Sequence, residues 1–248
     1  MQALNQHIGK DGFRLRGTAT SRIDGFSDVV FGFALTLLVV SLEVPRTYDE
    51  LHKILLAFYP FAICFTLFIT IWYAHLQFFR RFGLHDVATI SINCALLFTL
   101  LAYVYPLKFL FSLVVVGSVG HPTQAVFSND TQVRELIIVY GAGFAAIYLF
   151  LSALYWNAWR QRSLLCLSPL ENTLTLTYLL YTAVLCCIGL LCCAIAAIVP
   201  PLYAGDACYI LLLALIWRPI QKILSRRFIR AARARTPADE LAVFPLAS

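Results

Sequence analysis

The chain has 248 residues, of which 60% are hydrophobic and 13% are charged, and its net charge at pH 7 is +6. Soluble domains carry about 25% charged residues and do not bury so much apolar surface. Together with a mean hydropathy of +0.79, the composition excludes a soluble globular domain and indicates an integral membrane protein.

The apolar segments run without interruption for about 20 residues, which is the length of a helix that crosses the hydrocarbon core. Membrane-spanning strands would instead alternate apolar and polar residues over about 10. We therefore expect an all-α, polytopic membrane protein. Its six transmembrane helices are predicted at 26–45, 54–78, 87–107, 135–157, 174–199 and 207–225.

The first predicted span is preceded by ionisable residues, since Arg22, Asp24 and Asp28 stand at its start. An ionisable side chain costs about 2.5–3.5 kcal/mol at the bilayer centre, so such residues pair with one another and mark functional paths. Further along, Phe26, Val30, Phe33, Leu37 and Val40 recur at helical spacing and form one apolar stripe. Periodicity alone favours core packing as the role of this stripe.

The second and third spans add polar residues at a matching depth. At 1.5 Å per residue, Trp72 and His75 near the end of one span and Asn93 near the start of the next fall level with the polar start of the first. We expect these side chains to form a hydrogen-bonded network that fixes this end of the first helix. For Trp72, simple anchoring at the membrane interface is an equal alternative. The run 109–119, after Pro106, is predicted to lie at the interface or to extend the third helix.

The later spans contain no sharp motif. The CC-x4-CC pattern at 186–193 stands among Leu, Ile and Ala without a His or acidic neighbour, so we expect these cysteines to pack as small apolar residues, with no metal and no cofactor. The sequence also lacks the motifs of known catalytic sites, and we predict that the protein is not an enzyme.

The basic residues orient the predicted spans. With the N-terminus inside, fifteen of the 19 Lys and Arg residues fall on the cytoplasmic side, as the positive-inside rule requires. Both termini are therefore predicted to be cytoplasmic. The positive charge is a topology signal that favours anionic lipid over nucleic acid as a partner. The predicted domains are an N-terminal segment 1–21, a transmembrane domain 22–225 and a basic tail 226–248.

The start of the first helix also carries a family signature. The sequence RIDGFSD, followed by VVFGFALTLLVV, resembles the R-x-x-x-F-S-D motif of the transmembrane-protein-175 family of potassium channels. The tetrapeptide WYAH that ends at His75 is similar to a Trp-x-x-His motif of that family. Asn93 and Pro106 also stand where prokaryotic members have such residues. The resemblance covers the first three spans.

The resemblance implies a homotetramer of single-repeat subunits in the plasma or inner membrane, with four first helices around a central pore. It implies a constriction built from Phe33, Leu37 and Val40, with Thr36 supporting a modest preference for potassium over sodium. Phe33 departs from the isoleucine that is usual in the family. The network that holds the helix in its conducting arrangement would comprise Arg22, Phe26, Ser27, Asp28, Trp72, His75 and Asn93.

Two alternatives stay open at this point. In a proton-coupled or other secondary transporter, His75 and Asp28 would relay protons rather than hold a pore helix in place. In a membrane scaffold, the chain would transport nothing. Asp28 itself would concentrate cations if it faced the inner vestibule, but we favour a structural role in which it faces Arg22, His75 or a neighbouring subunit.

Overall fold

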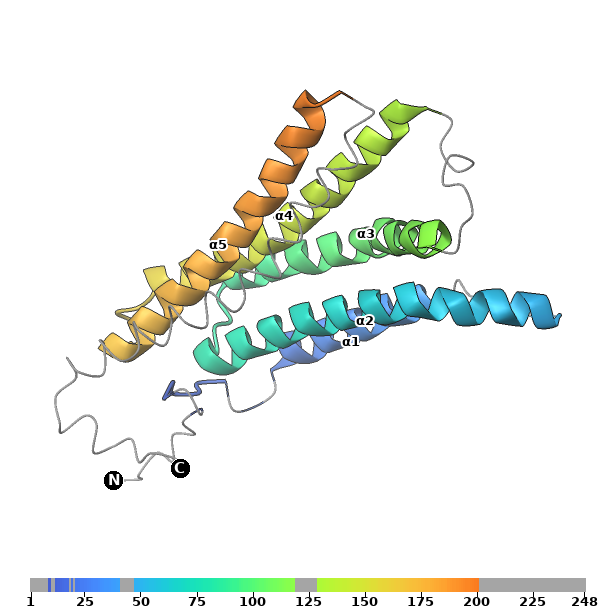
Figure 1. Cartoon of the computed structure of the whole chain (residues 1–248). Helices are drawn as coiled ribbons and strands as arrows, with labels where there is room; N and C mark the ends of the chain where they lie inside the picture. The colour runs from blue at the N-terminus through green and yellow to red at the C-terminus, as the bar shows by residue number, and fades with distance from the viewer. Residues whose placement is uncertain are drawn as a thin grey trace.

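The structure is a computed structural model that describes residues 9, 12–17, 19, 21–40, 47–118 and 129–200. These residues form five helices. Figure 1 labels each of them along the chain. The helices are α1 (Arg22–Val40), α2 (Tyr48–Phe82), α3 (Val87–Ser118), α4 (Asp130–Arg160) and α5 (Pro169–Ile198).

The prediction of six transmembrane helices is wrong for this structure. The described residues form five helices, and four of these contain stretches long and apolar enough to cross a membrane: Phe61–Phe82, Val87–Leu107, Thr131–Arg160 and Pro169–Ile198. The predicted sixth span, 207–225, and the basic tail, 226–248, lie outside the described residues. Hydropathy marks apolar runs in the sequence and does not by itself establish that each run is a separate spanning helix.

Side-chain caps explain where several helices begin. Ser21 and Asp24 exchange hydrogen bonds at the start of α1: the Ser21 backbone N–H donates to Asp24 Oδ2 at 3.0 Å, and the Asp24 N–H donates to Ser21 Oγ at 3.2 Å. Asp86 accepts hydrogen bonds from Thr89 in the first turn of α3. The apolar run after Pro106 extends α3, one of the two outcomes that the sequence allowed.

The helices are arranged as two groups joined through α3. α1 packs against α2 and α3, while α4 packs against α3 and α5. Figure 1 shows the pair α4 and α5 diverging from the pair α1 and α2, with α3 between them. Within the described part of the chain, α5 packs its backbone closely only against α4. The two groups also meet directly, because α2 packs against α4, where the Phe78 and Phe82 rings contact Tyr155.

Small residues allow α4 and α5 to approach closely. A Cβ atom added to Gly189 would lie 2.9 Å from the backbone nitrogen of Ala145 and from the carbonyl oxygen of Gly141. A Cβ added to Gly141 would lie 2.6 Å from Cys193 Sγ. Such spacing of small residues is the usual basis of close helix packing in membranes, where lipid gives helices no hydrophobic reason to associate.

We predict that Gly189→Val lowers the stability of the α4–α5 pair. The added methyl groups have no space, and overpacking of this kind costs about 1–3 kcal/mol. The measurement is thermal unfolding of the purified protein in detergent. Ala194→Val, at an exposed position of the same helix, is the matched control and should change little. Equal unfolding temperatures for both variants would contradict the close approach.

Candidate functional site

Asn93 of α3 connects α1 and α2 through a buried hydrogen-bond chain. Its Nδ2 donates to Ser27 Oγ at 2.9 Å, and its Oδ1 lies 2.7 Å from His75 Nε2. Because an amide oxygen can only accept, His75 Nε2 carries the proton of that bond. Ser27 Oγ in turn donates to the Ile23 carbonyl oxygen at 2.8 Å. All three side chains are buried, so the chain joins three helices rather than presenting groups to a ligand.

Asp28 and Trp72 form a separate contact between α1 and α2. The Trp72 indole N–H donates to Asp28 Oδ1 at 2.8 Å, and Asp28 is exposed in the single chain. The structure therefore gives Asp28 a partner on a neighbouring helix of the same chain. Neither Arg22 nor His75 is that partner.

Two residues of the predicted network lie outside these hydrogen bonds. Arg22 and Phe26 are both exposed, and Arg22 makes no hydrogen bond or ion pair with the residues that the structure describes. Asp24 is used for the helix cap, and its other oxygen, Oδ1, is buried without a partner among the described residues. The sequence placed these residues at the correct end of α1 but did not reveal their contacts.

α1 has one buried and one uncovered face. Ser27, Phe31, Ala34 and Leu38 are buried against α2 and α3. On the other side Phe26 is 56% exposed, Val29 70% and Phe33 56%, and these are the residues that a neighbouring molecule or a pore would meet.

The candidate constriction residues differ in their exposure. Phe33 is exposed, whereas Leu37 is half-buried and packs against the core. The Thr36 hydroxyl is exposed and donates to the Phe33 carbonyl oxygen at 2.7 Å. The side chain of Val40, the third predicted constriction residue, lies outside the described side chains.

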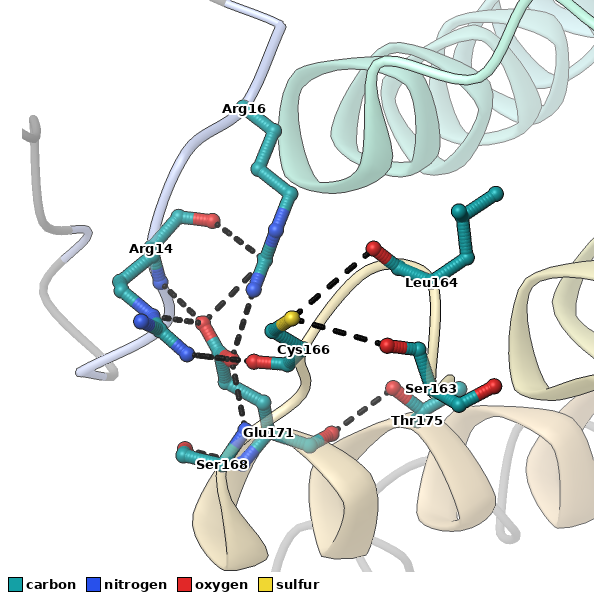
Figure 2. Close-up of polar contacts among 8 residues, drawn as sticks. All are labelled: Arg14, Arg16, Ser163, Leu164, Cys166, Ser168, Glu171 and Thr175. Carbon is teal, nitrogen blue, oxygen red and sulfur yellow. Dashed lines mark hydrogen bonds and ion pairs between the residues drawn. The ribbon is translucent and has the colours of Figure 1, made fainter. Parts of the chain in front are cut away.

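A second polar cluster, at the start of α5, was missed by the sequence analysis. Figure 2 shows the buried Glu171 carboxylate between Arg14 and Arg16 of the N-terminal segment. Arg14 Nη2 lies 3.0 Å and Arg16 Nη2 lies 2.8 Å from Glu171 Oε2. Arg14 also donates its backbone N–H and its Nε to Oε1, at 2.9 and 3.2 Å. We call this cluster the Glu171 clamp.

Part of the Glu171 clamp has a recognisable signal in the sequence. Ser168 and Glu171 have the S-x-x-E spacing of a capping box, and both reciprocal bonds are present: Ser168 Oγ accepts from the Glu171 N–H, and Glu171 Oε2 accepts from the Ser168 N–H. This spacing predicts the start of a helix. It does not predict that two arginines 155 or more positions away reach the same carboxylate.

A third cluster connects the start of α3 to the end of α4. The Asp86 carboxylate accepts from Thr89 Oγ1 at 2.6 Å and from Asn157 Nδ2 at 3.2 Å. Burial raises the pKa of this carboxyl, but hydrogen bonds from Thr89, Asn157 and Gln161 outweigh burial, and the pKa lies below its ordinary value of 3.8. Asp86 is therefore ionised at neutral pH and stabilises this contact.

Long apolar helices joined by buried polar side chains define a helical, multi-pass membrane protein. Comparison with known proteins identifies the family of membrane proteins to which the chain belongs. Residues 22–106 match the family described as the endosomal/lysosomal potassium channel TMEM175. A potassium channel from Marivirga tractuosa is 40% identical over 195 residues, which cover 76% of this chain and 79% of that protein. The chain belongs to the TMEM175 family.

Solved structures agree with this assignment. The potassium channel MtTMEM175, solved as a threonine-to-alanine variant in complex with a nanobody fusion, is 36% identical with a TM-score of 0.75. That match covers 86% of this chain and 95% of MtTMEM175. A TMEM175 homologue from Chamaesiphon minutus, at 22% identity and a TM-score of 0.52, covers 81% of this chain and 96% of its own and shows likeness of fold alone.

We predict that Asn93→Leu destabilises the protein strongly. The substitution leaves the buried His75 Nε2 without its partner, at about 1–3 kcal/mol, and removes the donor to Ser27 Oγ, which keeps its bond to the Ile23 carbonyl oxygen. Thermal unfolding in detergent measures this loss. Cys94→Leu, at the next and exposed position of α3, should have little effect. An Asn93→Leu protein as stable as the parent would show that the buried chain does not hold the helices together.

We predict that Asp86 makes stability dependent on pH in the acid range. Because the pKa of Asp86 is lowered in the folded state, its stabilisation is complete above the unfolded-state pKa and is lost as the pH falls through the folded-state pKa. At pH values below about 4, the unfolding temperature of the protein should therefore decrease. Asp86→Asn should make this acid-induced decrease in the unfolding temperature smaller. Glu135→Gln, at an exposed position of α4, should leave the decrease unchanged. An identical fall in Asp86→Asn would contradict this assignment.

Proposed function

We propose that the chain is a subunit of a potassium channel. Its membership in the TMEM175 family and its 40% identity to a protein described as a potassium channel support this proposal. The structural observation that carries it is the uncovered face of α1. This face holds Asp28 and Thr36 beside exposed Phe26, Val29 and Phe33.

The polar residues on this face argue against contact with lipid. A charged side chain facing hydrocarbon costs a few kcal/mol, so a face that carries Asp28 is suited to water or to another protein surface. Gly25 and Gly32 lie on the same face, and nothing lies within 4 Å of the position of a Cβ at either glycine. We infer that copies of the chain associate through α1. In a homotetramer, as the family resemblance implies, four such faces would surround one central pore.

The proposed constriction consists of Phe33, Leu37 and Val40. A narrow ring of apolar side chains excludes water and raises the cost of passing a bare ion, which is how a hydrophobic neck gates. Phe33 is more exposed than Leu37, the other constriction candidate with a described side chain, and phenylalanine is bulkier than isoleucine. Four phenyl rings would therefore close the neck more tightly than four isoleucines.

The proposed selectivity is a modest preference for potassium over sodium. Potassium sheds its hydration shell at lower cost, so a neck too narrow for the hydrated ion favours it. We assign the support of this preference to the Thr36 hydroxyl, which is exposed one turn from Phe33. In this proposal potassium is the permeant ion and the chain needs no cofactor.

The test is ion flux into proteoliposomes that contain the purified protein, with potassium and sodium compared. Phe33→Ile should raise potassium flux, about tenfold for each 1.4 kcal/mol by which the barrier falls. Leu37→Ala should raise sodium flux relative to potassium flux. Phe98→Ile, at an exposed position of α3, is the matched control and should behave as the parent does.

The number of subunits is measured in parallel by light scattering of the purified complex. Equal potassium and sodium flux in the parent would contradict the selectivity. Saturating flux coupled to a proton gradient would contradict a channel and indicate a carrier. A monomer that conducts ions would contradict the pore formed between copies.

A further inference from the structure

The N-terminal segment is fitted closely onto the end of α2. The Arg16 N–H donates to the Arg81 carbonyl oxygen at 3.4 Å, and the Gly17 N–H donates to the Arg80 carbonyl oxygen at 3.1 Å. A Cβ atom on Gly17 would collide with the Phe79 carbonyl oxygen, so a side chain there would push the segment away. The segment therefore has one defined position against this helix end.

Phe13 fixes the other end of the same segment. Its side chain is fully buried, and its ring meets Phe82 edge-on with centroids 5.4 Å apart. The buried Arg81 guanidinium lies over the Phe13 ring at 5.3 Å and over the Tyr178 ring of α5 at 4.3 Å. Residues 13–17 thus lie in a packed site between the end of α2 and the start of α5.

The Glu171 clamp holds this segment to α5 by charge. Glu171 is fully buried and accepts hydrogen bonds from both Arg14 and Arg16. Charge-assisted bonds to a carboxylate that is shielded from water are stronger than those at the surface. Figure 2 shows both guanidinium groups converging on the one carboxylate. Neutralising that carboxylate would remove the negative charge that the two ion pairs share.

The position of the segment matters because α1 follows it at once. Gly17 is five positions before Arg22, the first residue of α1. α5, in contrast, packs its backbone closely only against α4 among the described helices. The Glu171 clamp therefore connects α5 to Arg16, six positions before the start of the proposed pore helix, through contacts other than the packing of helix on helix.

We propose that Glu171 is a positioning residue for α1: by holding Arg14 and Arg16 it fixes the Arg22 end of that helix relative to α5 and sets how often the pore conducts. This inference rests on the proposed channel function. Glu171 does not touch the ion or the constriction, so it acts through the segment 13–17. Loosening the clamp should change the fraction of time the pore is open and leave the conductance of the open pore unchanged.

The test combines single-channel recording in bilayers with a distance measurement that needs no ion flux. Glu171→Gln removes the charge from α5, and the double variant Arg14→Gln/Arg16→Gln removes it from the segment. Both should change the open probability about fivefold or more, as expected for a coupling between two sites. Unitary conductance and the potassium-to-sodium preference should stay at the parent values.

Ser168→Ala is the matched control. It removes the serine half of the capping box but leaves both arginines on Glu171. If the gating change arises only from a weakened cap of α5, Ser168→Ala, which weakens the same cap, will also change gating. If Glu171 acts through the segment, Ser168→Ala will gate as the parent does.

The distance measurement uses spin labels at Ala19 and Leu164, two exposed positions before α1 and before α5, in samples diluted with unlabelled protein. Glu171→Gln and the double arginine variant should broaden the distance distribution, and Ser168→Ala should not. Unchanged distances, or broadened distances with unchanged open probability, would overturn the proposal. If the parent protein conducts no potassium, the proposed channel function is contradicted instead. The spin-label distances would then still test whether the clamp positions the segment, because they need no ion flux.

Discussion

The structure depends on one constraint: a polar group buried among apolar helices must find a partner within the protein. An unpaired group of this kind costs more than an ordinary hydrogen bond contributes, because neither lipid nor the apolar core replaces the lost water. Asn93 shows the consequence most clearly. Its amide has a donor and an acceptor side, and it uses them on Ser27 of α1 and His75 of α2. One side chain thereby fixes the relative positions of three helices.

The same constraint acts at the other polar cluster with a full charge. Glu171 is buried and would be costly alone, but two arginines, a backbone N–H of the N-terminal segment and its own cap residue surround it. Removing one partner of such an ion pair leaves the buried charge of the other partner uncompensated. Residues 13–17 thus pack against the helices rather than standing apart from them.

One face of α1 is held by contacts within the chain, and its other face is exposed. The buried face of α1 is held to α3 by the hydrogen bond from Asn93 to Ser27, the exposed Asp28 contacts Trp72 of α2, and the segment before Arg22 is held to α5. The opposite face carries Phe26, Val29 and Phe33 and has no cover within the described chain. In the proposed channel, such a helix would line the pore between copies, and changes at its anchored end would alter the neck.

The sequence by itself determined the all-α membrane class, because composition and the length of apolar runs leave no other way to satisfy the backbone in lipid. It also determined that Ser27, Asp28, Trp72, His75 and Asn93 lie at one depth, because helical rise is constant. Only the tertiary structure decided that Asn93 is the bridge, that Asp28 pairs with Trp72 rather than Arg22, and that Glu171 receives Arg14 and Arg16. It also corrected six expected helices to five in the described chain. Pairing depends on the rotation of each helix and on contacts between residues far apart along the chain, and neither periodicity nor hydropathy contains that information.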